Sequence, residues 1–441
     1  MHRRCHRREA RARVESLESR RLLTVFAVTG TPGDDTITVV AAAGNVTITV
    51  NGTPTTQPDA SVTGISVDAL GGNDTIAVQD VTDNPTTLLG GDGDDRITVT
   101  IVDFNASTPA ITANGGSGGD DAATLSDPNN TFADRWTVTA STITRTFFAG
   151  LSFPGVEALR LECGPGANRV DVTDTPAGVT TQIAGGGGAG ASRVPATAPG
   201  TAVQLDGGPG LDAVLVDPTV SGRAVATLIG SQDLALVEVR ADGTLSMGAS
   251  LTDVVSMTAL SLGPASSFDL GRGSAVWDYD PVLGSPFAGA AALVSSGYNG
   301  GAWDGAGIAS AAARLDSTKA VGYAEANAVF TSFPAAYAGI MVDDSSVLFR
   351  YTLSGDANLN RSVAIEDFSQ LATNFNLSPR PWSAGNFNFD AGVTLGDFAA
   401  LASNYNLSIP SAMPAARGVF SGSPLAGVID RVPDLVTRLT A

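Results

Sequence analysis

The stretch GGDGDDRITV, at residues 90–99, shows the pattern that decides the fold of the first half of the chain. Glycines come first, an aspartate follows, and apolar residues then occupy alternate positions. The same order recurs in TPGDDTITV, LGGNDTIAV, GGSGGDDAATL and GGPGLDAVLV, at residues 31–39, 70–78, 115–125 and 207–216. Glycine permits a left-handed turn, and apolar alternation is typical of a strand with one buried face. Residues 24 to about 270 are therefore predicted to form short strands separated by tight turns, without helical periodicity.

These turns are similar to the haemolysin-type GGxGxDxUx repeat, whose parallel β-roll binds calcium between successive turns. In that family the nine-residue units follow one another directly. Here the turn aspartates lie about 20 to 90 residues apart, and they are Asp35, Asp74, Asp95, Asp121 and Asp212. The wider spacing predicts a parallel β-helix or β-solenoid with longer coils, and a two-sheet β-sandwich is the rival architecture. The aspartates are expected to cap turns without a metal, with calcium binding as the alternative.

Composition limits the classes of function. The chain has 441 residues, of which 43% are hydrophobic, so it can bury large cores in two or three domains. Its net charge of −19 argues against a nucleic-acid partner. Both histidines, His2 and His6, lie in the basic leader, which excludes a Ser-His-Asp triad and His-ligated zinc from the rest of the chain. No stretch reaches the length of a membrane span.

The basic leader covers residues 1–23. Its end, LESRRLL at residues 17–23, is similar to the Leu-Glu-Pro-Arg-x-Leu-Leu leader of large secreted bacterial surface proteins, with Ser19 in place of proline. That resemblance implies an extracellular or cell-surface location. A frayed basic amphipathic helix is the alternative interpretation.

Near the carboxyl end, one loop–helix unit occurs twice at an offset of thirty residues. The segments DFSQLATNFNLS (367–378) and DFAALASNYNLS (397–408) share eight of twelve residues and are predicted to be helical. Each follows a loop rich in Asp and Asn, whose oxygens can surround a hard cation such as calcium. The predicted ligands are Asp356, Asn358, Asn360, the Ser362 carbonyl and Asp367 in loop 1, and Asn386, Asn388, Asp390, the Gly392 carbonyl, Thr394 and Asp397 in loop 2. Val363 and Val393, at position 8 of each loop, are expected to point inward and join the loops.

The duplicated unit resembles a type I dockerin, a small two-calcium module that docks onto a cohesin in polysaccharide-degrading assemblies. The resemblance implies a small α-helical module, calcium in both loops, and a cohesin-like protein or another surface or matrix component as partner. The chain departs from the family at position 6, where Arg361 and Ala391 replace glycine, and at Asn386, which replaces the opening aspartate. An Asn/Asp-rich turn that binds nothing is the alternative.

These patterns divide the chain into a leader (1–23), a β-solenoid body (24–275), an Ala/Gly/aromatic connecting module (276–352), a dockerin-like module (353–408) and a loose tail (409–441). In the connecting module, Tyr298, Trp303 and Tyr323 could form a sugar-stacking surface. They are expected instead to fill a small core between the body and the dockerin-like module.

The favoured function is that of a secreted or surface-attached, non-catalytic protein that docks through its calcium module in a polysaccharide-degrading or matrix assembly. One alternative is a polysaccharide-active β-helix enzyme, a lyase or a glycoside hydrolase, which needs paired carboxylates or a basic residue in a groove. Asp278, Asp280 and Asp304 are carboxylates without a paired spacing, and Lys319 is the only lysine. A carbohydrate-binding module without turnover is the third possibility.

Overall fold

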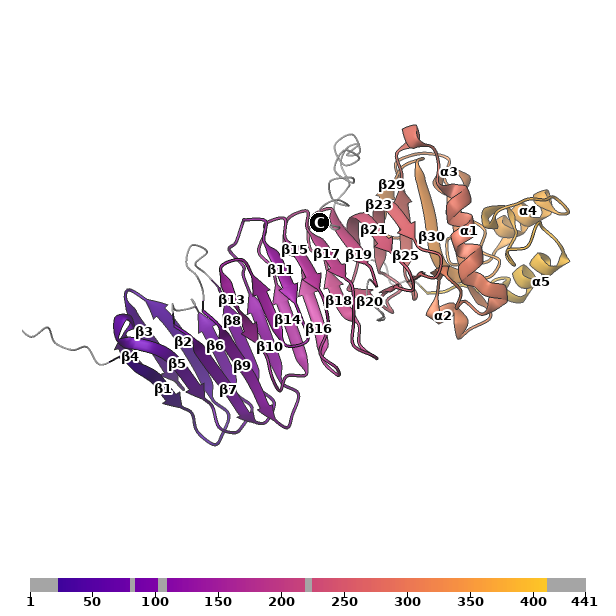
Figure 1. Ribbon diagram of the computed structural model, residues 1–441. Helices are drawn as coiled ribbons and strands as arrows, with labels where there is room; N and C mark the ends of the chain where they lie inside the picture. Colours follow the sequence, from indigo (N-terminus) through magenta and orange to yellow (C-terminus); the bar gives the residue numbers. More distant parts are fainter. Residues whose placement is uncertain (1–22, 80–83, 102–108, 219–223, 411–441) are drawn as a thin grey trace, which may run out of the picture.

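The structure is a computed structural model that describes residues 23–79, 84–101, 109–218 and 224–410. Within these residues the chain is mainly β, and a β-solenoid of about nine turns forms its body (Figure 1). The predicted tail (409–441) lies outside the described residues beyond Pro410, and of the leader (1–23) only Leu23 is described. No helix of the described ranges is long and apolar enough to cross a membrane.

Two long sheets run along the solenoid. In the described residues, sheet A has 15 strands and sheet B has 13. Sheet A contains, in spatial order, β1 (Thr24–Thr29), β5 (Val62–Asp68), β7 (Thr86–Asp92), β9 (Ile111–Ser117), β13 (Phe148–Ser152), β12 (Thr142–Arg145), β11 (Arg135–Val138), β15 (Arg169–Val172), β17 (Ala191–Val194), β19 (Asp212–Val216), β21 (Gln232–Val239), β23 (Val254–Leu262), β25 (Ser274–Asp278), β30 (Ser346–Leu353) and β27 (Lys319–Glu325). Sheet B contains β26 (Gly307–Ala309), β24 (Ser267–Asp269), β22 (Thr244–Met247), β20 (Val225–Leu228), β18 (Val203–Asp206), β16 (Thr180–Ala184), β14 (Ala158–Glu162), β10 (Ala122–Ser126), β8 (Arg96–Thr100), β6 (Thr75–Gln79), β2 (Thr36–Ala42), β3 (Asn45–Val50) and β4 (Thr53–Pro58).

Successive coils pair in parallel, so identical positions of the repeat stack on one another. Ile37 of β2 lies opposite Ile76 of β6, which lies opposite Ile97 of β8, and all three are buried. Each such column buries apolar surface between the two sheets, which is the main favourable term in folding. The predicted β-solenoid is confirmed, and the β-sandwich alternative is wrong because neighbouring strands come from successive coils.

The glycines of the turn motif are required by close backbone stacking. Gly116 has a φ of +122°, and a Cβ atom built there would overlap the carbonyl oxygen of Gly91 on the preceding coil. Gly91 has a φ of +119° and lies in the same way against the carbonyl of Leu70. A side chain at either position would strain the backbone and push neighbouring coils apart.

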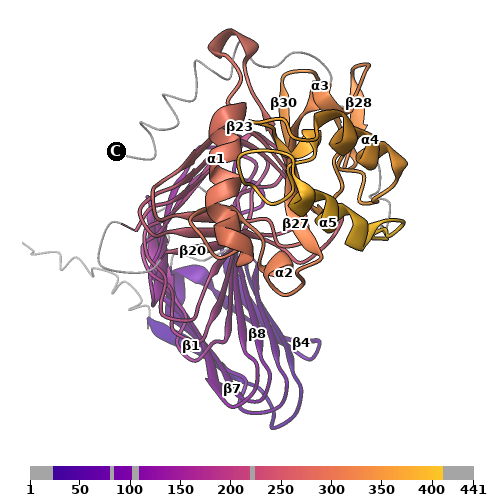
Figure 2. The same cartoon turned by 90° about the vertical axis from the view of Figure 1, so that its right-hand side faces the viewer.

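The connecting residues 276–352 close the carboxyl end of the solenoid, and we call them the solenoid cap. The strands β30 and β27 extend sheet A in antiparallel fashion. Helix α1 (Phe287–Tyr298) lies across the last coil and contacts β26 (Figure 2). The cap also contains α2 (Ala311–Arg314), α3 (Ala326–Val329) and a hairpin of β28 (Ala335–Tyr337) and β29 (Ile340–Val342).

Gly116→Ala should lower the free energy of unfolding by about 1–3 kcal/mol or more, the usual cost of a residue forced into a strained backbone conformation. Gly33→Ala is the matched control, because a Cβ at Gly33 would meet no atom within 4 Å. Its effect should stay within about 0.5 kcal/mol. Urea denaturation measures both, and equal midpoints for the two variants would contradict the stacking role of Gly116.

Candidate functional site

The duplicated segment folds as two loop–helix units, with α4 (Ile365–Asn374) after loop 1 and α5 (Leu395–Asn404) after loop 2. A buried aspartate in the first turn of each helix reaches back into its loop. Asp367 Oδ1 accepts the backbone N–H groups of Ala357 (2.8 Å) and Asn358 (3.3 Å), and its Oδ2 accepts that of Ala364 (2.8 Å). The equivalent Asp397 repeats the set, because its Oδ1 accepts two loop N–H groups at 2.7 and 3.2 Å and its Oδ2 accepts one at 2.8 Å. The duplication therefore extends from sequence to hydrogen-bond geometry.

Loop 1 wraps around Asp356, which is fully buried. Its Oδ1 accepts the Asn360 N–H at 3.1 Å, its Oδ2 accepts the Arg361 N–H at 2.7 Å, and the Thr352 hydroxyl also donates to it. The side-chain oxygen of Asn358 accepts the N–H of Asn360 at 3.1 Å. The predicted ligands Asp356, Asn358 and Asn360 are thus brought together around one turn.

Next to them, the Asn360 side-chain oxygen accepts the Ser362 N–H at 2.7 Å. Arg361, at position 6, has a φ of +68°, the left-handed conformation that usually favours glycine. Loop 1 therefore keeps a tight left-handed turn at position 6 although arginine stands there.

Loop 2 differs at its first position. Asn386 donates from Nδ2 to the carbonyls of Arg380 (2.9 Å) and Asp390 (2.8 Å). Its Oδ1 is buried and accepts no hydrogen bond. A buried acceptor without a partner costs about 1–3 kcal/mol, so this oxygen is available to a cation.

The remaining predicted ligands of loop 2 bond to one another. Asn388 donates from Nδ2 to Asp390 Oδ2 at 3.0 Å, and Asp390 Oδ1 accepts the Gly392 N–H at 2.9 Å. Thr394 caps α5, because its hydroxyl accepts the Gly396 N–H at 3.2 Å and donates to Asp397 at 3.2 Å. Thr394 thus has a structural role beyond the predicted one.

Electrostatics favours a cation at loop 1. Burial raises the pKa of Asp356 to about 7, and the nearby charge of Asp367 acts in the same direction. Burial also raises the pKa of Asp367.

Within the described ranges, no group of three or more His, Cys, Asp and Glu side chains is arranged to hold a metal ion. Each loop offers two carboxylates together with amide, hydroxyl and carbonyl oxygens, a donor set whose chemistry suits calcium.

The position-8 valines are buried as predicted, but their backbone partners differ from the expectation. Val363 exchanges hydrogen bonds with Asn406 and Leu407, which follow α5. Val393 exchanges the equivalent bonds with Asn376 and Leu377, which follow α4. Each loop is therefore hydrogen-bonded to the residues that follow the helix of the other unit, rather than directly to the other loop.

The two helices leave a repeated set of apolar side chains in contact with solvent. Ile365 and Leu395 open α4 and α5 and are 57% and 73% exposed. The rings of Phe368 and Phe398 lie 6.3 Å apart. The other partly exposed members are Phe375, Leu377, Tyr405 and Leu407. We call these eight residues the helix face; exposed apolar side chains are typical of an interaction site where they gather in one patch.

The aromatic residues of the cap are packed inside the structure. Trp303 and Tyr323 are buried, and the ring of Tyr298 lies 5.1 Å from that of Trp303 in an edge-on arrangement. Phe389 of loop 2 fills the space between them, 4.7 Å from Tyr298. The expectation of a small core is confirmed, and the sugar-stacking surface is wrong because the rings are covered.

The turn aspartates of the body form a buried ladder between coils. Asp74 Oδ1 accepts the N–H of Asp35 at 2.6 Å, Asp95 Oδ1 accepts that of Asp74 at 2.8 Å, and Asp121 Oδ1 accepts that of Asp95 at 2.7 Å. Asp212 holds Gly190 in the same way at 2.7 Å. Asp35 caps its own turn as predicted, because its Oδ2 accepts the N–H of Thr31 at 2.6 Å. The other four aspartates hold an amide of the preceding coil instead of an amide of their own turn.

A second ladder runs on the exposed side of the same turns, and the sequence analysis missed it. Asp34 Oδ1 accepts the N–H of Asn73 at 2.8 Å, Asn73 Oδ1 accepts that of Asp94 at 3.0 Å, and Asp94 Oδ1 accepts that of Asp120 at 2.9 Å. These residues immediately precede the buried aspartates. The doublets DD, ND, DD and DD were the available signal.

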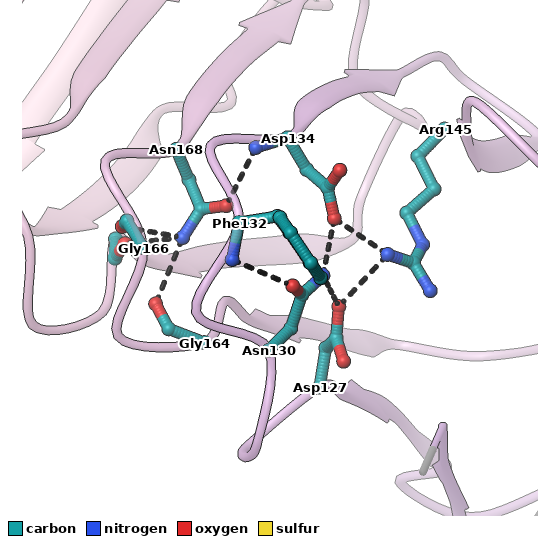
Figure 3. Close-up of polar contacts among 9 residues, drawn as sticks. Asp127, Asn130, Phe132, Asp134, Arg145, Gly164, Gly166 and Asn168 are labelled. Atoms are coloured by element: carbon teal, nitrogen blue, oxygen red, sulfur yellow. Dashed lines mark hydrogen bonds and ion pairs between the residues drawn. The ribbon is translucent and has the colours of Figure 1, made fainter. Parts of the chain in front are cut away.

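Asp127 and Asp134 form a carboxylate pair that the sequence analysis did not single out, and ion pairs with Arg145 close it. Asp127 and Asp134 both contact Arg145 Nη1, at 3.2 and 2.5 Å, and Asn130 donates to both carboxylates (Figure 3). Arg145 also lies over the buried ring of Trp136, 5.1 Å from its centroid. The Asp127 side chain is fully buried, and burial raises its pKa. The pair therefore ties the β12 hairpin to the solenoid instead of facing a groove.

Comparison of the chain with protein-family models, curated proteins and solved structures finds no match. The family resemblances inferred from the turns and from the duplicated loops therefore stay predictions. The case for function rests on the geometry of the two loops, the helix face and the solenoid body.

Arg145→Met should lower the free energy of unfolding by about 3–5 kcal/mol, because it leaves buried carboxylates without their cation. Arg160→Met is the control, since Arg160 and Glu162 form a partly exposed pair worth about 0–1 kcal/mol. Chemical denaturation at neutral pH measures the difference. Equal losses in the two variants would show that the Arg145 network contributes no more than a surface pair.

Asp212→Asn should make the chain more stable at about pH 8 in calcium-free buffer. Burial raises the pKa of Asp212 from 3.8 to about 7. Its stabilising contribution is therefore fully present below about pH 4 and is lost as the pH rises through about 7. The advantage of the variant should grow across this window when unfolding is followed against pH. An advantage that shrinks with rising pH would contradict the assignment.

Proposed function

We propose that residues 353–408 are a calcium-dependent docking module, carried by a non-catalytic β-solenoid on the outside of the cell. The observation that carries the proposal is the repeated geometry of the two units. Both loops end in a buried aspartate that accepts three backbone N–H groups, and both units then carry the same set of partly exposed apolar side chains.

Calcium is the proposed metal, and it would supply a positive charge that cross-links the loop oxygens. In loop 1 the ligands are Asp356, Asn358, Asn360, the Ser362 carbonyl and Asp367. In loop 2 they are Asn386, Asn388, Asp390, the Gly392 carbonyl, Thr394 and Asp397. The buried charge of Asp356 and the unpartnered Oδ1 of Asn386 support this choice, because an ion would offset both costs.

The helix face is the proposed docking surface, and the resemblance to dockerins suggests a cohesin-like protein as its partner. Buried aromatic anchors usually carry most of the energy of such an interface. Phe368 and Phe398 are aromatic, lie 6.3 Å from each other and suit that role. A surface or matrix protein of another family remains within the same proposal.

The solenoid would act as a spacer or an adhesive body. The enzyme alternative has less support, because Asp127 and Asp134 are neutralised by Arg145 and covered. The sugar-binding alternative loses its main residues, because Trp303 and Tyr323 are buried.

Calorimetric titration of the full chain with calcium should give about two ions per chain. Asp356→Ala with Asp367→Ala should remove one of them, and Asp390→Ala with Asp397→Ala should remove the other. The exposed-turn variant Asp242→Ala serves as the control and should keep both. The proposal would be contradicted if the wild-type chain bound no calcium, or if both double variants bound as much calcium as the wild type.

Replacement of Phe368 and Phe398 by serine should abolish calcium-dependent capture of a partner from the secreted fraction while leaving calcium uptake intact. The reason is that neither ring belongs to a predicted ligand residue. Capture by wild type in the presence of chelator, or undiminished capture by the variant, would argue against the helix face.

A further inference from the structure

Both loops of the C-terminal module contact the rest of the protein through the residue at position 4. Phe389, at position 4 of loop 2, inserts into the solenoid cap, where its ring lies 4.7 Å from Tyr298, 5.7 Å from Trp303 and 6.2 Å from Tyr323. Trp382, from the segment between the two units, adds a fourth ring at 5.5 Å. Phe389 itself lies between two predicted ligands, Asn388 and Asp390.

Loop 1 makes the matching contact with the residue at its own position 4. Leu359 is buried and lies against Gly322 of β27, where an added Cβ atom would come within 2.5 Å of Leu359 Cδ2 and 2.6 Å of Trp382 Nε1. The Arg350 guanidinium of β30 donates to the Leu359 carbonyl at 2.6 Å. Leu359 and Phe389 share a left-handed φ, of 59° and 60°.

Polar bonds near the same boundary also involve loop residues. Within the module, Trp382 Nε1 donates to the carbonyl of Asp356, the first predicted ligand, at 2.7 Å. Arg361 donates to the carbonyl of Arg272 in the body at 3.3 Å. The arginine that replaces the usual glycine of loop 1 thus reaches across the boundary.

The last helix adds one further tie, because Asn404 donates to the carbonyls of Thr318 and Ser354 at 3.1 and 2.7 Å. The helix face is not used at this boundary, since its eight residues keep partial exposure. The module therefore contacts the cap mainly through its loops, while the helix face stays partly exposed to solvent.

We infer that calcium binding to the loops and seating of the module on the solenoid cap are one coupled equilibrium. This inference rests on the proposed calcium function. An ion held by positions 3 and 5 fixes the left-handed residue at position 4, and that residue is the one that enters the cap. By linkage, the cap must in turn raise the affinity of the loops for calcium by the same factor. Calcium then converts a loosely attached module into the rigid end of the rod.

Gly322→Val in the full chain tests the coupling from the body side, because it obstructs Leu359 and Trp382 without altering any loop residue. The calcium Kd should rise at least about five-fold, the lower end of usual coupling strengths. Gly289→Val is the matched control, since Gly289 is an exposed position of the same cap with no atom within 4 Å of an added Cβ. Its calcium Kd should equal that of wild type.

Tryptophan emission supplies an independent readout of seating. Calcium should shift the emission of wild type, because Trp303 and Trp382 lie at the boundary. The shift should be lost or should need more calcium in Gly322→Val. Phe389→Ala, which acts from the module side, should give the same result as Gly322→Val. Circular dichroism of both variants checks that the solenoid keeps its strands.

The outcomes separate the two proposals. Unchanged calcium affinity and an unchanged emission shift in Gly322→Val and Phe389→Ala, with wild type binding calcium, would overturn the coupling and leave the calcium function standing. Failure of wild type to bind calcium would overturn both.

Discussion

Buried aspartate carboxylates that accept backbone N–H groups, from the preceding coil in the solenoid and from their own loop in the C-terminal module, are the interaction on which both halves of this protein depend. In the solenoid, Asp74, Asp95 and Asp121 each hold the backbone of the coil before. In the C-terminal module, Asp367 and Asp397 each hold the start of their own loop. A carboxylate can be buried only where such donors are supplied, so its presence dictates the backbone path around it.

The solenoid and the C-terminal module differ in how the polar oxygens of these side chains are hydrogen-bonded. The solenoid aspartates leave Oδ2 of Asp74, Asp95 and Asp212 without a hydrogen bond, packed in narrow glycine turns. Asp367 and Asp356 have both oxygens hydrogen-bonded within the module, and Asn386 leaves its buried Oδ1 without a partner. The turns of the body are thus closed against their neighbours, whereas the loops of the module gather oxygen donors at one place.

Local patterns in the sequence predicted the elements, and distant contacts decided the rest. Glycine–aspartate turns and alternating valine and isoleucine predicted a stacked solenoid, because each coil repeats the same burial. The duplication predicted the two loop–helix units. The coil partner of each aspartate, the pairing of Val363 with Leu407, and the insertion of Phe389 among cap aromatics depend on residues far apart in the chain, which spacing alone does not encode. Likewise, nothing in the order of Asp127, Asp134 and Arg145 revealed that they close on one another.

The central claim is that the C-terminal loops are metal sites, while the solenoid holds itself together through its own hydrogen bonds. Amide hydrogen exchange on the full chain, compared in calcium and in chelator, tests both parts in one experiment. The account predicts that calcium slows exchange at Asn360 and Arg361 of loop 1 and at Phe387 of loop 2, while the ladder amides of Asp74 and Asp95 are protected equally in both conditions. Identical exchange of the loop amides with and without calcium would contradict it.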